Sequence, residues 1–447
     1  MHLKKQHINR RSFVGKSVKA ATLLSIAPTF ALAATKQPEK KLKLVLVGTG
    51  IRGVHSWGID LVEPYSDYVE MVGLCDSNKK RVEVAKEMIG TNAKTYHSSK
   101  FDLMLREQKP DFVIVTTTDN VHVDYIVRAM ELGCNVISEK PIATDELQCQ
   151  RILEAEKKSG KKIYVGFNVR YMNESIEMKK IIGAGEIGKI ISIEYQEYLN
   201  TDHGASYFRR WHGKTKYSGS LFVHKSSHHF DLINWILDAD PVEVRAMGAL
   251  AFYGANKKFA GKNCRNCNFT NSCEFYWDIT KKSMLKKLYV DCETIDNYYR
   301  DGCVWDAKID SPDSGSVLVQ YDNGTQLNYS LNAYLPYEGQ KISFSGDKGR
   351  LDVRLYYNQP WLDHTKIEFR LTKNRKTTKN WEIFPDRGNH SGADNKIKDD
   401  FFKPGQKFFF KQRAGSRAGV LSSLIGIAAL KSIKTGNSVK IKDLIKL

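Results

Sequence analysis

The sequence lacks a long apolar run after its first 33 residues, so no later segment is expected to cross a membrane. It also lacks a dense basic run interleaved with aromatic residues, the usual footprint of a nucleic-acid-binding protein. The formal charge of +19 is high, but the 69 lysines and arginines are scattered. We therefore expect no membrane insertion of the mature chain and no nucleic-acid partner, and we interpret the charge as mostly solvated surface.

Cysteine is scarce, with eight residues in 447, and unevenly distributed. Three cysteines stand alone in strand-like or helix-like segments and are expected to be buried small hydrophobic residues: Cys75, Cys134 and Cys149. Five others lie in a Gly/Asn/Lys-rich insertion near 262–303. Four of them have spacings with which thiolates can close on a structural zinc ion: Cys264, Cys267, Cys273 and Cys303. Disulfides are the alternative in an exported protein, and an iron–sulfur centre ranks third.

The first residues have the pattern of an export signal. Arg10 and Arg11 precede a short apolar segment that ends in Ala31-Leu32-Ala33, whose small side chains suit a signal peptidase. Residues 1–33 thus resemble a twin-arginine signal, which implies export to the periplasm in the folded state. A disordered basic N-terminus is the alternative. The remaining chain is long enough for two or more domains, and 41% hydrophobic content is enough to form their cores.

An apolar strand beginning at Leu42 runs directly into the motif Gly48-x-Gly50-x-x-Gly53. Such a turn lets backbone amides approach a pyrophosphate and lets a helix pack on the strand. The next strand ends on Asp76, whose carboxylate can accept hydrogen bonds from ribose hydroxyls, so NAD is favoured over NADP. Capping of a helix over 79–88 is another role for Asp76. The expected cofactor contacts in this part are Gly48, Thr49, Gly50, Ile51, Arg52, Gly53 and Asp76.

Two further strand-helix units follow. The strand 112–116 leads into a helix over 121–131, and the strand 135–138 leads to Glu139-Lys140-Pro141. Helices alternating with apolar strands predict an α/β fold with a doubly wound parallel sheet, whose ligand crevice lies at the carboxyl ends of the strands. The residues expected at such ends are Thr117, His122, Glu139 and Lys140.

These residues together resemble the glucose-fructose oxidoreductase and inositol dehydrogenase family, often called Gfo/Idh/MocA. The motifs that carry the resemblance are GTGIRG, the Asp76 ending, TTTDNVH and EKP, followed by GFNVRYM at 166–172, GEIGKI at 185–190 and GSLFVHKSSHHFDLINWIL at 219–237. The resemblance implies an NAD-binding Rossmann domain over 34–164. It also implies an α+β domain over 165–447, whose open, mostly antiparallel sheet covers the nicotinamide and often forms the interface of a homo-oligomer.

The resemblance also implies the catalytic residues. In that family the lysine of EKP, here Lys140, lies beside the nicotinamide, and a D-x-G-x-H-x-x-D pattern supplies an acid–base pair. This chain has His224-x-Ser226-x-His228-x-x-Asp231, so His224 replaces the aspartate. Our hypothesis is that His228 is the base, Lys140 stabilises the alkoxide or relays the proton, and His224 orients the substrate, although these roles can exchange. Histidines held only for packing and capping are the alternative.

Two segments supply further candidates. In the motif GFNVRYM, Asn168 is expected to contact the cofactor, and Tyr171 is expected to be an additional acid–base group. Residues 201–212 have the pattern of a loop and place polar and aromatic side chains where hydroxyls and C–H faces of a sugar need them. A basic surface loop is the alternative. The expected substrate contacts are Tyr171, His203, Tyr207, Arg210, Trp211, His224, Lys225 and His228.

The remaining pattern supports an antiparallel sheet. Two alternating segments, 316–321 and 326–332, flank the turn Asp322-Asn323-Gly324 and predict a hairpin. Further strands are expected at 341–345 and 366–371. A helix over 418–434 has an apolar stripe that ends at Gly436 and is expected in the core.

An exported dinucleotide enzyme leaves the nicotinamide pool behind, so NAD is expected to be tightly bound and reoxidised on the protein. The hypothesis that makes the fewest demands is an oxidoreductase acting on a sugar or sugar derivative. A redox-neutral glycoside hydrolase that works by oxidation, elimination, hydration and reduction is close behind. A non-enzymatic dinucleotide sensor is a further alternative.

Overall fold

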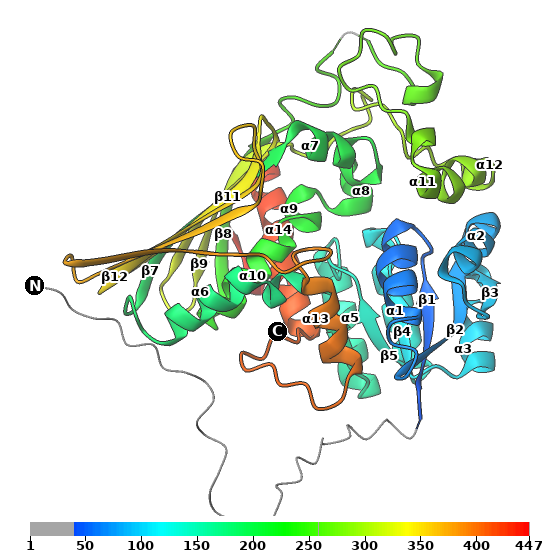
Figure 1. The fold of residues 1–447 in the computed structure, drawn as a ribbon, viewed down its shortest axis with the longest axis horizontal. Coiled ribbons are helices and arrows are strands. Elements are labelled where there is room, and N and C mark those ends of the chain that lie inside the picture. The colour runs from blue at the N-terminus through cyan, green and yellow to red at the C-terminus, as the bar shows by residue number, and fades with distance from the viewer. Residues whose placement is uncertain (1–39, 258, 447) are drawn as a thin grey trace, which may run out of the picture. The chain divides into compact units, whose positions relative to one another are not determined.

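The fold was analysed in a computed structural model that describes residues 40–257 and 259–446. The twin-arginine signal predicted for residues 1–33 lies outside this range and stays a prediction. The described residues belong to one compact unit. Within it, a six-stranded sheet and a nine-stranded sheet lie on either side of a central group of helices (Figure 1).

The first sheet is the predicted doubly wound parallel sheet, with strand order β3-β2-β1-β4-β5-β6. Its central strand β1 is apolar and has four fully buried residues at its carboxyl end, as a strand covered on both faces requires. The strands are β1 (Leu42–Val47), β2 (Val69–Asp76), β3 (Lys94–His97), β4 (Phe112–Val115), β5 (Asn135–Ser138) and β6 (Ile163–Val165).

The connecting segments are mostly helical. After the glycine motif the chain forms a π-helical stretch, Gly53–Ile59, that continues into α1 (Asp60–Val62). The other helices are α2 (Lys79–Ile89), α3 (Phe101–Gln108), α4 (His122–Glu131) and α5 (Glu146–Ser159). Asn78, not Asp76, caps α2, because its side chain accepts hydrogen bonds from the Lys80 and Arg81 amides. The suggested capping role of Asp76 is therefore wrong.

The second sheet is mixed and mostly antiparallel, with order β14-β13-β12-β11-β7-β10-β9-β8-β15. Only β7 and β10 pair in parallel. The predicted hairpin is confirmed, since β9 and β10 are antiparallel neighbours. The strands are β7 (Ile190–Asn200), β8 (Pro241–Ala249), β9 (Ser314–Tyr321), β10 (Gln326–Leu335), β11 (Glu338–Gly346), β12 (Gly349–Asn358), β13 (Lys366–Lys373), β14 (Thr377–Ile383) and β15 (Val439–Lys440).

Helices cover the face of this sheet that is turned toward the first sheet (Figure 1). They are α6 (Asn173–Gly183), α7 (Thr201–Phe208), α8 (Thr215–Ser218), α9 (Leu221–His224), α10 (Ser227–Leu237) and α14 (Ser416–Thr435). Helix α13 (Ala393–Phe402) packs on the side of the parallel sheet instead, where Phe401 stacks on Trp57 and Tyr164. The loop predicted at 201–212 is therefore wrong for its first eight residues. Asn200 caps α7 by accepting from the His203 amide. A Cβ on Gly204 would overlap the carbonyl of Ala333, so glycine allows α7 to lie against β10.

Helix α14 joins the two halves of the molecule. It packs against β8 and α10 of the second sheet's layer and against α5 of the first. Among the described residues it is the one helix whose length and apolar composition match a membrane span, although the sequence was expected to contain none. About 67% of that apolar window is buried inside the structure, which agrees with the predicted core role. The two sheets thus share one hydrophobic core, and the predicted domain boundary at 164 separates two sheets within one unit.

The cysteine-rich insertion reaches back over the first sheet. Its helices α11 (Ser283–Leu288) and α12 (Glu293–Asp296) lie beside α2 (Figure 1). Ile279, Leu288 and Tyr289 are buried in the cluster on the outer face of the parallel sheet. The Asn78 side-chain nitrogen donates to the Cys292 carbonyl, and the Arg81 Nε donates to the Leu288 carbonyl. The insertion is therefore part of the dinucleotide-binding layer in space, although it comes much later in sequence.

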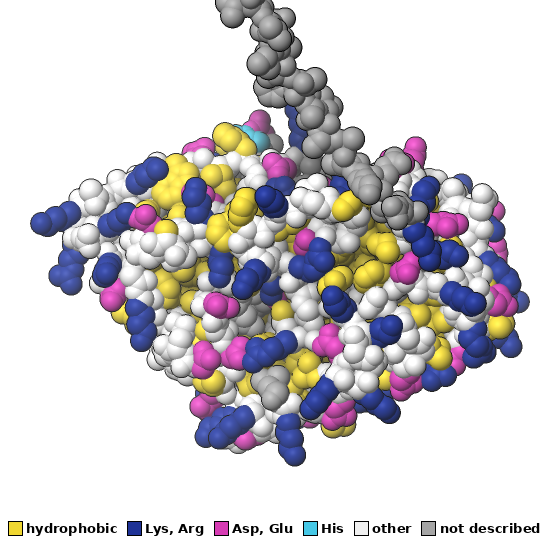
Figure 2. All heavy atoms as spheres, turned by 90° about the horizontal axis from the view of Figure 1, so that it is seen from below, with side chains coloured by type: hydrophobic (Ala, Val, Ile, Leu, Met, Phe, Trp, Pro, Cys, Tyr) yellow, Lys and Arg dark blue, Asp and Glu magenta, His cyan; other side chains and the backbone are white. Residues whose placement is uncertain are grey.

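Charged side chains are dispersed on the surface. Figure 2 shows lysine and arginine side chains scattered over one face and interleaved with aspartate and glutamate. The three cysteines predicted to be buried are confirmed, with exposures of 0%, 6% and 0% for Cys75, Cys134 and Cys149.

Candidate active site

One large cavity, of about 1330 Å³, lies at the carboxyl ends of the parallel strands. It exceeds the range of roughly 300–1,000 Å³ that is common for a site holding one small ligand. The first sheet contributes the glycine turn, Asp76, Thr117, Glu139 and Lys140 to its wall. The second layer and the insertion contribute His203, Tyr207, Arg210, Trp211, His224, Lys225, His228, Tyr289, Tyr298 and Arg300. The cavity therefore has room for a dinucleotide and a second molecule.

The glycine turn has the backbone that a dinucleotide needs. Gly48 has φ +89°, and a Cβ there would lie 2.7 Å from the backbone of Thr116 and Thr117. Gly53 is equally constrained, because a Cβ would overlap the Gly48 carbonyl. The Ile51 amide donates a 2.8 Å hydrogen bond to the hydroxyl of Tyr289 from the insertion. An acceptor oxygen thus already lies at the amide end of the turn.

Asp76 is held rigidly at the end of β2. Its carboxylate accepts hydrogen bonds from the Thr49 amide at 2.7 Å, the Thr49 hydroxyl at 2.9 Å and the Asn78 amide at 2.8 Å. Arg81 lies 3.5 Å from it and pairs with Asp296 at 2.7 Å. Asp76 lines the cavity, whereas Thr49 and Gly53 lie behind the turn and support it.

Arg52 connects the turn to two carboxylates. Its Nε donates to Glu139 at 2.6 Å and its Nη1 to Asp394 of α13 at 2.9 Å. The Asn168 side-chain nitrogen donates to the same Asp394 at 2.6 Å, while the Asn168 side-chain oxygen is buried without a partner. The Glu139 carboxylate also accepts from the Trp57 indole. These contacts fix the wall between the glycine turn and Lys140.

His122 lies between two loops of the crevice. Its Nδ1 is 2.8 Å from the Pro141 carbonyl and its Nε2 is 3.2 Å from the Thr117 carbonyl. Burial lowers the pKa of His122. The ring therefore positions the loops that follow β4 and β5. These loops contain Thr117 and Lys140.

Lys140 and His224 lie together across the two layers. The Lys140 Nζ donates to the His224 carbonyl at 2.9 Å, and the His224 Nδ1 lies 2.6 Å from the Asp119 carboxylate. Burial lowers the pKa of Lys140 to about 8, although Asp119 and Glu139 act in the opposite direction. Burial and the charge of Lys140 also hold the pKa of His224 well below its usual range. A neutral ring whose Nδ1–H donates to Asp119 presents an unprotonated Nε2.

His228 lies in the first turn of α10 and lines the same cavity. Its Nδ1 is buried without a hydrogen-bond partner among the described residues. Burial, with the charges of Lys140 and Lys225, holds its pKa well below the usual range, so the ring is neutral near pH 7. Lys225 pairs with the buried Glu197 at 3.2 Å. The acid–base candidates therefore comprise two neutral imidazoles and one amine of low pKa.

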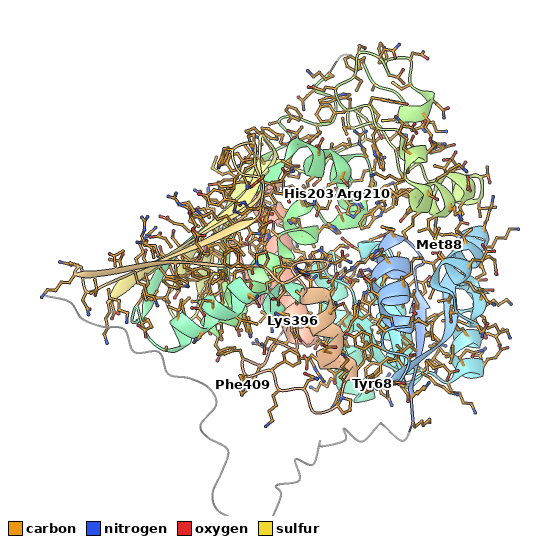
Figure 3. All side chains as sticks on the ribbon, in the orientation of Figure 1. Tyr68, Met88, His203, Arg210, Lys396 and Phe409 are labelled. Atoms are coloured by element: carbon orange, nitrogen blue, oxygen red, sulfur yellow. The ribbon has the colours of Figure 1, made fainter. Side chains whose placement is uncertain are left out.

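Polar and aromatic groups line the substrate side. The His203 Nδ1 lies 2.9 Å from the Glu338 carboxylate, and its ring stacks on Tyr207. Trp211 stacks on His212 with centroids 3.6 Å apart. Figure 3 labels His203 and Arg210 at the two ends of the α7 region, between the nine-stranded sheet and the insertion.

Tyr171 lies outside the cavity, so its predicted catalytic and substrate roles are wrong. Its hydroxyl donates to the Asp400 carboxylate at 2.5 Å, and its ring packs edge-on against Phe408. Only 1% of the residue is exposed. Asn168, Val169 and Met172 of the same motif line the cavity, whereas Tyr171 turns away from it, which sequence spacing does not reveal.

Several cavity residues were not predicted from sequence: Asp119, Glu174, Tyr289, Tyr298, Arg300 and Glu338. Asp119 belongs to the quoted motif TTTDNVH, so its position after a parallel strand was a usable signal. The insertion residues gave no such signal, because their proximity to the glycine turn arises only from the fold.

The cysteine cluster is not arranged as a metal site. Cys264, Cys267, Cys273 and Cys303 line one small cavity of about 20 Å³. In residues 40–257 and 259–446, however, no group of three or more His, Cys, Asp or Glu side chains is placed to hold a metal ion, and all eight cysteines are free thiols. The Arg209 Nη1 donates to the Cys264 sulfur at 3.0 Å instead. The structure therefore gives no support to the predicted zinc ion or to the disulfide alternative.

Comparisons with known proteins agree with this geometry. The family model described as "Oxidoreductase family, NAD-binding Rossmann fold" matches residues 42–167, and the model described as "Oxidoreductase family, C-terminal alpha/beta domain" matches residues 179–441. A Bacillus subtilis (strain 168) protein named "Putative oxidoreductase YteT" is 33% identical over 427 residues, which cover 90% of this chain and 99% of that protein.

Two more distant similarities extend the comparison. Inositol 2-dehydrogenase of Salmonella typhimurium (strain LT2) is 29% identical over 198 residues, which cover 43% of this chain and 54% of that protein. The crystal structure of aldose-aldose oxidoreductase from Caulobacter crescentus, complexed with glycerol, has a TM-score of 0.61 at 15% identity. It covers 90% of this chain and 100% of its own, and at that identity it supports the fold alone.

Proposed function

Because the chain belongs to the Gfo/Idh/MocA family of NAD(P)-dependent oxidoreductases, we propose that it oxidises a hydroxyl group of a sugar or sugar derivative, using NAD bound in the large cavity. One observation carries the proposal. Lys140, His224 and His228 line the same cavity as the Gly48–Gly50 turn, so acid–base groups and the dinucleotide cradle face one space.

The residues around the turn fit a dinucleotide. Gly48 gives the turn its positive φ, and Gly50 lines the cavity. The Ile51 amide is bonded to the Tyr289 hydroxyl, so a bound diphosphate would accept from that hydroxyl or replace it at the amide. Asp76 is placed for the ribose hydroxyls, which favours NAD over NADP. Asn168 and Thr117 lie farther along the wall, toward Lys140. When bound, NAD supplies the acceptor for the hydride that leaves the substrate carbon.

The acid–base work falls to three side chains. His228 is a neutral imidazole near pH 7 and accepts the hydroxyl proton. The Lys140 amine, with a pKa of about 8, receives that proton or stabilises the alkoxide. Asp119 fixes the His224 ring, whose free Nε2 orients a neighbouring hydroxyl. The acid–base steps assigned to these three side chains require no metal ion.

A polyhydroxylated ligand fits the rest of the wall. Buried polar atoms without partners among the described residues are the carboxylate oxygens of Glu174, the Ser175 hydroxyl, the Asn168 carbonyl oxygen and the His228 Nδ1. All four residues line the cavity. Such atoms are costly to bury unless a ligand or water pairs with them. Tyr207 and Trp211 offer ring faces for C–H groups, and the relative named inositol 2-dehydrogenase supports the sugar assignment.

The position of the insertion is the observation that favours a retained cofactor. The residues around Tyr289 and Asp296 cover the dinucleotide turn and are anchored to Asn78 and Arg81. We therefore propose that NAD stays bound and is reoxidised on the protein by a second carbonyl compound. Together with the Arg10-Arg11 segment, this agrees with folded export to the periplasm.

A second copy of the chain is proposed to cover the open face of the nine-stranded sheet. Ile191, Met247 and Leu318 are 56%, 78% and 54% exposed on strands of this sheet. Size-exclusion chromatography with light scattering tests this, and replacement of Met247 and Leu318 by lysine is expected to shift an oligomer toward monomers.

The function is tested on the purified protein without added cofactor. Denaturation followed by mass spectrometry is expected to release NAD, and a sugar with a carbonyl acceptor is expected to be turned over. Release of nitrophenol from nitrophenyl glycosides would instead indicate the redox-neutral hydrolase. Bound NAD with neither activity would indicate a sensor and would contradict the proposal.

A further inference from the structure

Among the described residues, three guanidinium groups of the cavity have no carboxylate partner. Arg209 is bonded to the Cys264 sulfur and the Phe275 carbonyl, whereas Arg210 and Arg300 have fewer partners. Arg210 follows α7, and its Nε and Nη2 bond only the backbone carbonyl and hydroxyl of Ser206. Arg300 belongs to the insertion, and its Nε is buried without a hydrogen-bond partner among the described residues. The two groups lie over tyrosine rings, at 5.6 Å from the centroid of Tyr207 and 4.5 Å from that of Tyr289.

Four other cations of the cavity each have a carboxylate within 4.0 Å: Arg52 with Glu139 and Asp394, Arg81 with Asp296, Lys214 with Asp306, and Lys225 with Glu197. Lys140 donates to the His224 carbonyl, and Lys262 and Lys308 are exposed to solvent. No ion pair within the described chain involves Arg210 or Arg300. Burial and the charge of Arg300 lower the pKa of Arg210 to about 10. Enclosed positive charge of this kind costs free energy unless an anion offsets it.

Arg210 lies on the substrate side of the cavity. It directly precedes Trp211 and His212, and the His212 ring centroid is 4.2 Å from that of His224. His224 in turn contacts Lys140 and Asp119. The Tyr298 hydroxyl, next to Arg300 in the insertion, is also buried without a partner among the described residues. An anion held here would therefore be close to the reacting end of the site.

We propose that Arg210 and Arg300 form an oxyanion subsite that binds a carboxylate carried by the sugar, so that the substrate is an acidic sugar such as a uronic acid. A guanidinium fork matches a carboxylate with two parallel hydrogen bonds, which a neutral hydroxymethyl group does not offer. This inference rests on the proposed function for its sugar. The diphosphate of the dinucleotide is the other possible source of an oxyanion, and the experiment separates the two.

The test compares four probes on the purified holoprotein: D-galacturonate, D-glucuronate, D-galactose and D-glucose. Binding is measured by isothermal titration and by the shift in thermal unfolding, and reduction of bound NAD by absorbance at 340 nm. At least one uronate is expected to bind about 10-fold or more tightly than its neutral counterpart. Arg210→Gln and Arg300→Gln are each expected to remove this preference.

Lys308→Gln is the matched control, because Lys308 is an exposed cation at the cavity rim and its loss changes the net charge equally. It is expected to keep the preference. Nucleotide content, measured after denaturation, is expected to be unchanged in both arginine variants. Loss of nucleotide with an unchanged uronate preference would assign the arginines to the diphosphate and overturn the substrate subsite.

Equal or absent binding of acidic and neutral sugars would also overturn it. Failure of the proposed function gives a different result. In that case a uronate would still bind through Arg210 and Arg300, as measured by titration, but bound NAD would not be reduced.

Discussion

The Asp119 carboxylate lies 2.6 Å from the Nδ1 of His224, and the two residues come from different layers of the molecule. Asp119 follows β4 of the parallel sheet, whereas His224 ends α9 beneath the mixed sheet. The pair restores an aspartate to a place where the family pattern has one, but the carboxylate now orients an imidazole. The contact also ties the position of the substrate-side histidine to the dinucleotide-binding layer.

Asp119→Asn is expected to lower kcat by roughly 100-fold or more, because an amide nitrogen can donate to Nδ1 and favour the wrong tautomer of His224. KM and the content of bound NAD should change little. Steady-state kinetics and nucleotide analysis check this. Asp124→Asn is the matched control, since Asp124 lies on the exposed face of α4 and pairs only with Arg151. Equal losses in the two variants would contradict a positioning role for Asp119.

The pKa of Lys140 predicts how kcat depends on pH. Its pKa of about 8 means that the neutral amine forms as the pH rises through that value. If the amine receives the substrate proton, kcat for oxidation increases toward pH 8 and levels off above it. Lys140→Arg, which stays protonated, should lose this step. A wild-type rate that falls through pH 8 would show that the charged amine is the active form.

Gly48→Ala is expected to destabilise the chain by about 2 kcal/mol or more, because a Cβ would add backbone overlap at 2.7 Å to the strain of a positive φ. Gly90→Ala is the matched control. Gly90 also has a positive φ, +69°, but a Cβ there meets no atom within 4 Å, so the expected cost is about 1 kcal/mol. Chemical denaturation measures both. Equal costs would mean that the overlap with Thr116 and Thr117 relaxes freely.

The buried ion pair Arg170–Asp231 gives a stability prediction. The guanidinium donates to both carboxylate oxygens, at 2.7 and 2.5 Å, and each side chain is almost fully buried. Arg170→Met should cost about 3–5 kcal/mol, because it leaves Asp231 buried and unpaired. The double variant Arg170→Met with Asp231→Asn should recover part of that loss. Urea unfolding of the three proteins checks the order, and a double variant less stable than the single one would contradict it.

Export is tested by Arg10→Lys with Arg11→Lys. The twin-arginine prediction expects the wild type in the periplasmic fraction with NAD bound, and the double variant in the cytoplasm. Cell fractionation and nucleotide analysis measure both. Periplasmic protein from the double variant would contradict the prediction.

The parallel sheet was predictable because each of its signals is local. Apolar strands, the glycine turn and the Asp76 ending lie within short segments. The hairpin at Asp322-Asn323-Gly324 was local in the same way. The helix α7 was not, because Gly204 reads as a helix breaker until β10 is placed against it.

The site was predictable only where family motifs carry it. Lys140, His224 and His228 were found through those motifs and line one cavity. Tyr171 belongs to a neighbouring motif but turns away from the cavity, toward Asp400. Arg300 and Tyr289 lie more than two hundred residues from the glycine turn, so no spacing rule connects them with it.

Helix α14 follows α5, α10 and β8 in the sequence, and all three rest on it. Their apolar surfaces stay uncovered on a ribosome-bound chain until residues 416–435 have left the ribosome. A premature stop before Ser416 would therefore leave both layers open to proteases and aggregation.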